Sequence, residues 1–314
     1  MLIKKFYIMQ QKLILRIIYM VSSFLVMSLV FSGCSTNKSG ENTQVTNLDS
    51  LAVNDIFQDI GETKKIFYSL PSPLETAMLI KTAGATYNQE LLNPVENSEN
   101  YATNRSKALN LGIYTTDLSF ASLFDQTQAS INYMNAAKEM ADGLGILDAI
   151  NNTTIERLEE NVNNRDVIMD IISETFLSSS SYLKENNREA VATIVLVGGW
   201  IEGLYIGTQL AAGKPIENNK LVERIAEQKL SFEIVQRLLN EHMKDQDVSS
   251  LMEEIEVLAP IFDEIIIEST PITVDENEET KVATLNSQST ITISEDVFER
   301  LTKNVQTLRN KFIL

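Results

Sequence analysis

The segment from Val191 to Gln209, which reads VATIVLVGGWIEGLYIGTQ, limits the folds open to this chain more than any other. Its single charged residue is Glu202, so almost the whole stretch must be removed from water. Glycines at positions 199, 203 and 207 are four residues apart, and this spacing puts them on one face of a helix that a neighbouring helix can approach closely. A lipid bilayer or the centre of a helical bundle would accept such a helix.

Glu202 favours the bundle over the bilayer, because a carboxylate near the middle of a membrane span is costly. Inside a bundle, a buried carboxylate must be ion-paired, hydrogen-bonded or protonated. We expect Glu202 to bind an arginine and lock the bundle, and candidates include Arg105, Arg165, Arg188 and Arg224. The alternative is a binding pocket in which Glu202 lies beside Trp200 and Tyr205. Asp117 is a second acid in an apolar setting, and we expect it to cap the N-terminus of the segment that follows.

Apolar residues elsewhere recur mostly at helical spacing, which predicts an all-α fold, a multi-helix bundle or array around the glycine-rich helix. Capping residues at Ser72-Pro73-Leu74-Glu75 and at Ser294 mark two helix starts. The serine run 178–181 is interpreted as the polar side of its helix. The expected helices are 72–83, 87–92, 98–120 with a break near Gly112 or Thr115–Thr116, 127–144, a short one opening at 153, 164–184, 187–212 capped by Asn187, 217–243, 248–267 and 294–312.

One segment departs from helical spacing. Between Pro271 and Ile293, threonine, valine and isoleucine alternate with polar residues, and the acidic run 275–279 lies within it. Alternation of this kind predicts a small hairpin, or else a mobile loop. The acidic run lacks the alternation and the glycine of a calcium-binding EF-hand loop, so we expect no calcium there.

The N-terminus has the parts of an export signal. Lys4, Lys5, Lys12 and Arg16 precede an uncharged stretch from Ile17 to Phe31, and Ser32-Gly33-Cys34 follows it. The alternative is an uncleaved transmembrane anchor over residues 17–33, but a spanning helix needs about 20 apolar residues and this run is slightly short.

Ser32-Gly33-Cys34 resembles the lipobox of bacterial lipoproteins, in which the signal peptide is removed and the cysteine carries lipid. Phe31 departs from the lipobox pattern, which usually has leucine at that position. The resemblance implies a signal peptide over 1–33, a lipidated cysteine with a flexible tether over 34–48, and a helical domain over 49–314. Ser35, where aspartate would signal inner-membrane retention, implies the outer membrane, and the absence of an acidic cluster in 35–40 implies its periplasmic side.

Composition excludes several classes of function. The chain has 26 basic and 43 acidic residues and a net charge of −17, so nucleic acid is not an expected partner. Cys34 is the only cysteine and His242 the only histidine, which excludes disulfides and histidine-rich zinc sites and argues against a Ser-His-Asp triad. We therefore expect no metal, no cofactor and no catalytic residue.

Three segments carry a further resemblance: Tyr68–Glu75, Ala108–Tyr114 and Gly198–Ile206. Together they resemble a group of uncharacterised all-helical lipoproteins of Gram-negative bacteria. The resemblance implies an envelope location and brings no activity, cofactor or site residue with it.

These observations favour an outer-membrane lipoprotein that faces the periplasm and acts as a binding or scaffolding protein. Its lipid attaches it to the membrane. A second partner is expected to be an envelope protein or a small ligand. The candidate binding residues are Asp117, Trp200, Glu202 and Tyr205. One alternative is a carboxylate-dependent envelope hydrolase that uses Glu202 and Asp117, which would need the two carboxyl groups about 5 to 9.5 Å apart in an open cleft. Another is a structural subunit of an envelope complex, which predicts a sizeable exposed apolar patch.

Overall fold

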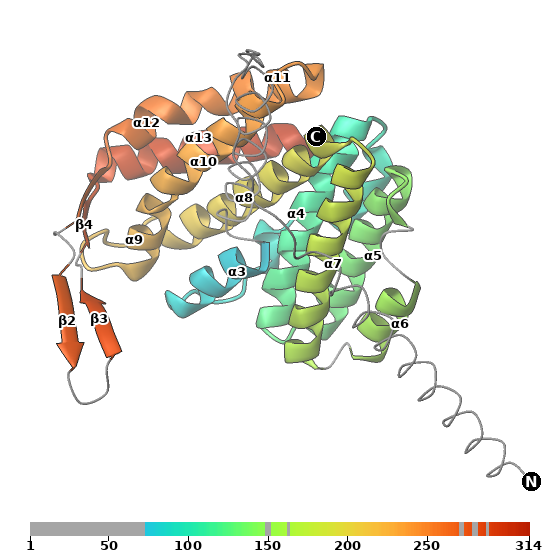
Figure 1. Ribbon diagram of the computed structural model, residues 1–314, viewed down its shortest axis with the longest axis horizontal. Helices are drawn as coiled ribbons and strands as arrows, with labels where there is room; N and C mark the ends of the chain where they lie inside the picture. Colours follow the sequence, from blue (N-terminus) through green and yellow to red (C-terminus); the bar gives the residue numbers. More distant parts are fainter. Residues whose placement is uncertain (1–72, 148–151, 162–163, 270–272, 278–281, 287–288) are drawn as a thin grey trace, which may run out of the picture. The chain divides into compact units, whose positions relative to one another are not determined.

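The computed structural model describes residues 73–147, 152–161, 164–269, 273–277, 282–286 and 289–314 (Figure 1). Cys34, the expected signal peptide and the expected tether lie outside these residues. All the described residues belong to one compact unit. The α-helices are α3 (Pro73–Thr82), α4 (Asn104–Leu123), α5 (Thr127–Gly143), α6 (Asn152–Glu160), α7 (Arg165–Glu185), α8 (Glu189–Ala211), α9 (Lys220–Ala226), α10 (Gln228–Glu241), α11 (Gln246–Ile255), α12 (Ala259–Asp263) and α13 (Glu295–Ile313). The predicted all-α, multi-helix architecture is confirmed.

Two antiparallel strand pairs interrupt the helices. The strand β1 (Ile266–Ser269) pairs with β4 (Ser289–Thr292), and Ile266 lies opposite Thr292. Between them, β2 (Thr273–Asn277) pairs with β3 (Val282–Asn286). Of the two interpretations of residues 271–293, the hairpin is therefore correct.

The glycine-rich helix α8 is central to the described fold. It is long and apolar enough to span a membrane, yet 89% of its most apolar window is buried by the rest of the chain. α4 packs along it, and α3, α7 and α13 also contact it. The prediction of a central buried helix, rather than a second membrane span, is confirmed.

Close contact between α4 and α8 explains why Gly112 does not break its helix. A Cβ atom on Gly112 would collide with the carbonyl oxygen of Val195, and one on Gly198 would collide with that of Leu109. The two backbones therefore touch where both helices carry glycine, and α4 continues without interruption through Gly112. Gly203 makes a similar approach to Thr76 of α3. The predicted break near Gly112 is wrong, because the glycine serves packing rather than helix termination.

Several helix boundaries also differ from those predicted. Asn187 adopts a left-handed conformation, with φ of 56°, after the end of α7, so it does not cap α8. The segment 217–243 forms two helices, α9 and α10, which meet at Glu227. The segment 248–267 divides into α11, a 3-10 turn (Glu256–Leu258), α12 and the strand β1, with Pro260 in the first turn of α12.

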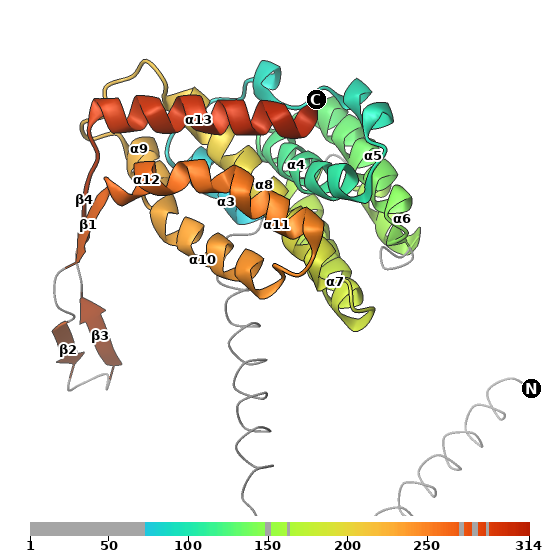
Figure 2. The same ribbon diagram turned by 90° about the horizontal axis from the view of Figure 1, so that it is seen from above.

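The last helix, α13, follows its predicted design. Ser294 caps it by accepting a hydrogen bond from the backbone N–H of Val297 at 3.3 Å. The expected apolar stripe is buried, and it comprises Val297, Leu301, Val305, Leu308 and Phe312. Figure 2 shows α13 lying across α8, which it contacts together with α4.

Candidate functional site

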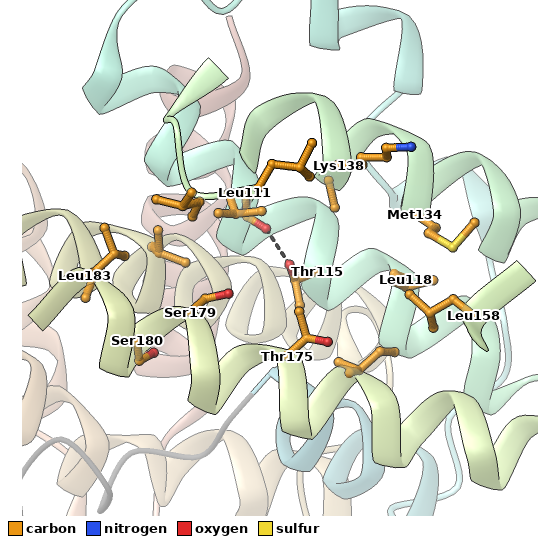
Figure 3. Close-up of a pocket in the computed structure, with 16 residues that line it drawn as sticks. Leu111, Thr115, Leu118, Met134, Lys138, Leu158, Thr175, Ser179, Ser180 and Leu183 are labelled. Carbon is orange, nitrogen blue, oxygen red and sulfur yellow. Dashed lines mark hydrogen bonds between the residues drawn. The ribbon is translucent and has the colours of Figure 1, made fainter. Parts of the chain in front are cut away.

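Five helices, α4 to α8, surround an apolar pocket with a volume of about 90 Å³ (Figure 3). One wall comes from α4, through Leu111, Thr115 and Leu118. The opposite wall comes from α7, through Ile172, Thr175, Ser179, Ser180 and Leu183. The remaining lining residues come from α5, α6, α8 and the turn after α5, and they are Met134, Ala137, Lys138, Ile146, Leu147, Leu158, Ala192 and Val195.

Helical spacing in the sequence creates this pocket. The α7 residues Ile172, Thr175, Ser179 and Leu183 are three or four positions apart, so they share one face of the helix. Small side chains in the middle of that face leave space that the flanking isoleucine and leucine do not fill. The serine run 178–181 was predicted to be the polar side of α7, and Ser178 and Ser181 are exposed as predicted. Ser179 and Ser180, however, line the pocket.

Polar groups lie in the middle of the pocket, as Figure 3 shows for Thr115, Thr175 and Ser179. The hydroxyl groups of Thr115 and Thr175 each donate to a backbone carbonyl one turn earlier, of Leu111 and Ile171, at 2.7 Å. Ser179 Oγ is buried and has no hydrogen-bond partner among the described residues. Each satisfied hydroxyl retains only acceptor capacity for a ligand, whereas Ser179 retains its proton.

The residues predicted to form a site meet elsewhere, around a buried ion pair. Arg309 of α13 donates two hydrogen bonds to Glu202, Nε to Oε2 and Nη2 to Oε1, both at 2.9 Å. The Glu202 side chain is fully buried, and that of Arg309 is 5% exposed. The guanidinium group also lies 4.5 Å from the ring centre of Tyr205 and donates to the carbonyl of Leu91.

An arginine partner for Glu202 was predicted, but none of the four candidates is the partner. Arg105 binds Glu254, Arg165 lies beside Asp125 and Asp166, Arg188 donates to the Leu144 carbonyl, and Arg224 binds Glu227. The true partner, Arg309, lies four residues after Val305 and directly after Leu308 on α13. Its position beside the apolar stripe was the signal that could have identified it.

Asp117 joins this cluster from the middle of α4, so the prediction that it is an N-cap is wrong. Its side chain is fully buried, and Oδ2 accepts a hydrogen bond from the backbone N–H of Asn93 at 3.1 Å. Burial and the nearby charge of Glu202 hold the pKa of the Asp117 carboxyl well above its usual value, against the opposing effect of Arg309. The environment beside the Glu202–Arg309 ion pair therefore favours the protonated form of Asp117 more than water does.

Trp200 lies apart from the other predicted residues. It is two positions from Glu202 on α8 and therefore projects from nearly the opposite side of the helix. Its indole N–H donates to Gln228 at 3.1 Å, and its ring stacks against Phe232 with 5.9 Å between centroids. Of the four predicted binding residues, three surround Arg309, one belongs to the aromatic core, and none lines the apolar pocket.

The buried cluster also holds the end of α13. Asn110 donates to the carbonyl of Phe312 at 2.9 Å, and the Tyr101 hydroxyl donates to that of Ile313 at 3.1 Å. The side-chain amide of Asn93 connects these two residues by donating to both. Carbonyl groups that the helix end leaves without a helical partner are thereby satisfied, so the cluster fastens α13 to α4 and α8.

This geometry does not meet the requirement of the hydrolase alternative. Neither Asp117 nor Glu202 has any exposed surface, whereas a glycoside hydrolase needs its two carboxyl groups in an open cleft. Within the described parts of the chain, no group of three or more histidine, cysteine, aspartate or glutamate side chains is arranged to hold a metal ion.

Sequence reasoning missed the apolar pocket, because its lining comes from five helices whose packing no local pattern encodes. The small residues on one face of α7 were the available signal. Comparison of this chain with protein-family models, with curated proteins and with solved structures gave no match in any of the three.

Proposed function

We propose that this protein is an envelope lipoprotein whose helical domain binds a small, largely apolar molecule in the pocket between α4, α5 and α7. The observation that carries the proposal is the pocket itself, a preformed hollow of about 90 Å³ with apolar walls and a few polar groups at its middle. Apolar concavities with a small number of polar groups are the usual form of small-molecule sites.

The buried ion pair supports binding over catalysis. Glu202, the most unusual acid in the sequence, is held by Arg309 inside the fold, and its role there is to fasten α13. The pocket is separate from this cluster and offers hydroxyl groups and one amine on apolar walls. Such a lining suits the holding and orientation of a ligand.

The location is proposed from the sequence. Basic residues, an apolar run and Ser32-Gly33-Cys34 support export and lipid attachment at Cys34. Ser35 supports the outer membrane, and the lack of acidic residues in 35–40 supports its periplasmic side. A lipid-anchored domain does not need a spanning helix, which agrees with the use of α8 as a core helix.

A neutral probe tests the pocket. We would titrate 1-pentanol into the full-length lipoprotein in lipid nanodiscs and follow binding by saturation-transfer NMR, with empty nanodiscs as the blank. Burial of a few methylene groups predicts a dissociation constant on the order of millimolar. Ala137→Leu, which fills the pocket, should weaken binding about tenfold, since a leucine side chain would occupy space that the probe needs.

The matched control is Ala259→Leu, the same change at a partly buried position of α12 that does not line the pocket. This variant should bind 1-pentanol as the unmodified protein does. Equal binding by the Ala137→Leu protein, or no binding by the unmodified protein, would refute a ligand site in this pocket.

A further inference from the structure

We propose that the natural ligand class of this pocket is a short-chain monocarboxylate, with its carboxylate bound by Ser179, its charge offset by Lys138, and its hydrocarbon chain against the apolar walls. This inference rests on the proposed function, because it names the chemistry of the same site. Three independent observations support it: the charge of the lining, an unused hydrogen-bond donor, and the size of the cavity.

The charge of the lining is opposite to that of the chain. Acidic residues outnumber basic ones by 43 to 26 over the whole sequence. Among the described residues that line the pocket, however, Lys138 is the one charged side chain. Lys138 is exposed at the α5 side and takes part in no ion pair within the described chain. An ammonium group on a long flexible stem, without a carboxylate of its own, is suited to an anionic ligand.

The unused donor is the hydroxyl group of Ser179. A buried hydroxyl without a partner carries a desolvation penalty, which a ligand acceptor would remove. The neighbouring hydroxyl groups of Thr115 and Thr175 already donate their hydrogen bonds to backbone carbonyls. A carboxylate oxygen is an acceptor that Ser179 can bind, and the ammonium group of Lys138 supplies the opposite charge on the same lining.

The shape and size of the cavity select the rest of the ligand. In Figure 3, Thr115, Thr175 and Ser179 occupy the middle of the pocket, with Leu183 to one side and Leu118 and Leu158 to the other. An apolar cavity of about 150 Å³ holds benzene, which has six carbons. By that comparison a volume of about 90 Å³ holds a hydrocarbon part of roughly three to four carbons, and longer acyl chains do not fit inside the pocket.

The test compares one hydrocarbon chain with three different head groups. Pentanoate, 1-pentanol and pentylammonium would be titrated separately into the full-length protein in nanodiscs and followed by saturation-transfer NMR. Pentanoate should bind about tenfold more tightly than 1-pentanol, as a charge-assisted hydrogen bond allows, and pentylammonium more weakly than either. From acetate to pentanoate, each added methylene should tighten binding about fourfold, and longer acids should gain nothing further.

Two substitutions assign the head-group contacts. Lys138→Met should weaken pentanoate binding about tenfold and leave 1-pentanol binding unchanged, and Ser179→Ala should have the same selective effect at a smaller size. Lys303→Met, an equal change of charge on an exposed position of α13, is the control and should change neither.

The outcomes separate the two proposals. If 1-pentanol binds in the pocket but pentanoate binds no better, or if Lys138→Met loses both ligands equally, the carboxylate inference is wrong and the apolar site stands. If neither ligand binds, both proposals are wrong.

Discussion

Glu202 and Arg309 lie 107 residues apart in the chain and form a two-point ion pair that is closed to solvent. The pair connects α8, the most apolar helix of the described fold, to α13, the last helix. A charged pair in such a place requires both partners, because either charge left alone would be buried without compensation.

The two substitutions should therefore not be additive, because the second removes the charge that the first leaves unpaired. We expect Glu202→Gln or Arg309→Met to lower the free energy of unfolding by about 3 to 5 kcal/mol, and the double variant to lose less than the sum of the two single changes. Urea denaturation followed by circular dichroism measures all three values.

The exposed pair of Arg300 and Glu264 provides the control. It has the same two-point geometry, with distances of 3.0 and 2.7 Å, but both side chains reach solvent. Arg300→Met should have a much smaller effect, because surface ion pairs are weakened by water and salt. A loss as large as that of Arg309→Met would show that burial is not what makes the Glu202 pair important.

Asp117 should make stability depend on pH. The folded state holds the pKa of this carboxyl above its unfolded value of 3.8, so the folded state binds the proton more tightly. The contribution of Asp117 is therefore most favourable at low pH and declines as pH rises from about 4 through the folded pKa. Asp117→Asn, a neutral group of similar shape, should gain stability relative to the unmodified protein as pH rises from 4 to 8. Melting temperatures of both proteins over this range measure the difference, and parallel curves would mean that Asp117 does not titrate as described.

The contact between α4 and α8 should tolerate no side chain at Gly112. Alanine there would collide with the backbone of α8, so we expect Gly112→Ala to cost about 3 kcal/mol or more in the free energy of unfolding. Gly207 offers a comparison within α8, since a Cβ atom there would lie 3.5 Å from Ile225, an ordinary contact. Gly207→Ala should stabilise the protein by about 0.5 to 1 kcal/mol through its higher helix propensity. Opposite signs for the two variants in urea denaturation would establish the close helix contact, and a tolerated Gly112→Ala would disprove it.

Cys34 should control association with the membrane. In a Gram-negative bacterial host, we expect the unmodified protein to incorporate an alkyne-labelled fatty acid and to sediment with the membranes. Cys34→Ala should incorporate no label, because the thiol that would carry the lipid is absent. Ser32→Ala, which keeps a small residue before the cysteine, is the control and should be labelled normally. Continued labelling of the Cys34→Ala protein would place the lipid on another residue, and no labelling of the unmodified protein would exclude lipid attachment.

Local sequence signals predicted the parts of this fold that local interactions determine. The Ser294 cap, the apolar stripe of α13 and the burial of α8 all follow from short patterns, and the structure confirms them. The role of Gly112 was misjudged, because a glycine that ends a helix and a glycine that lets two helices pack closely look the same in the sequence. Only the neighbouring helix, here α8, distinguishes the two roles. Arg309 was missed for a similar reason: many arginines could reach Glu202 in principle, and only the tertiary arrangement of α8 and α13 selects one.

The candidate site was less predictable than the fold. Unusual residues such as Glu202 and Trp200 attracted attention because they are rare in an apolar segment, yet both serve packing and stability. The pocket is formed by ordinary residues, and its defining property is space that their neighbours leave unfilled. A cavity depends on the sum of many side-chain volumes and on the positions of the helices, so no single sequence motif predicts it.

The partnership of Glu202 with Arg309 also sets an order of events during synthesis. At about 5 to 20 residues per second, the 107 residues between them take on the order of 5 to 20 s to translate. During that time Arg309 has not yet been synthesised, so Glu202 of α8 lacks its partner. Until then, burial of Glu202 in the bundle would leave its charge without the arginine that binds it in the folded protein, which is costly. We therefore expect the bundle to close around Glu202 only once α13 is available.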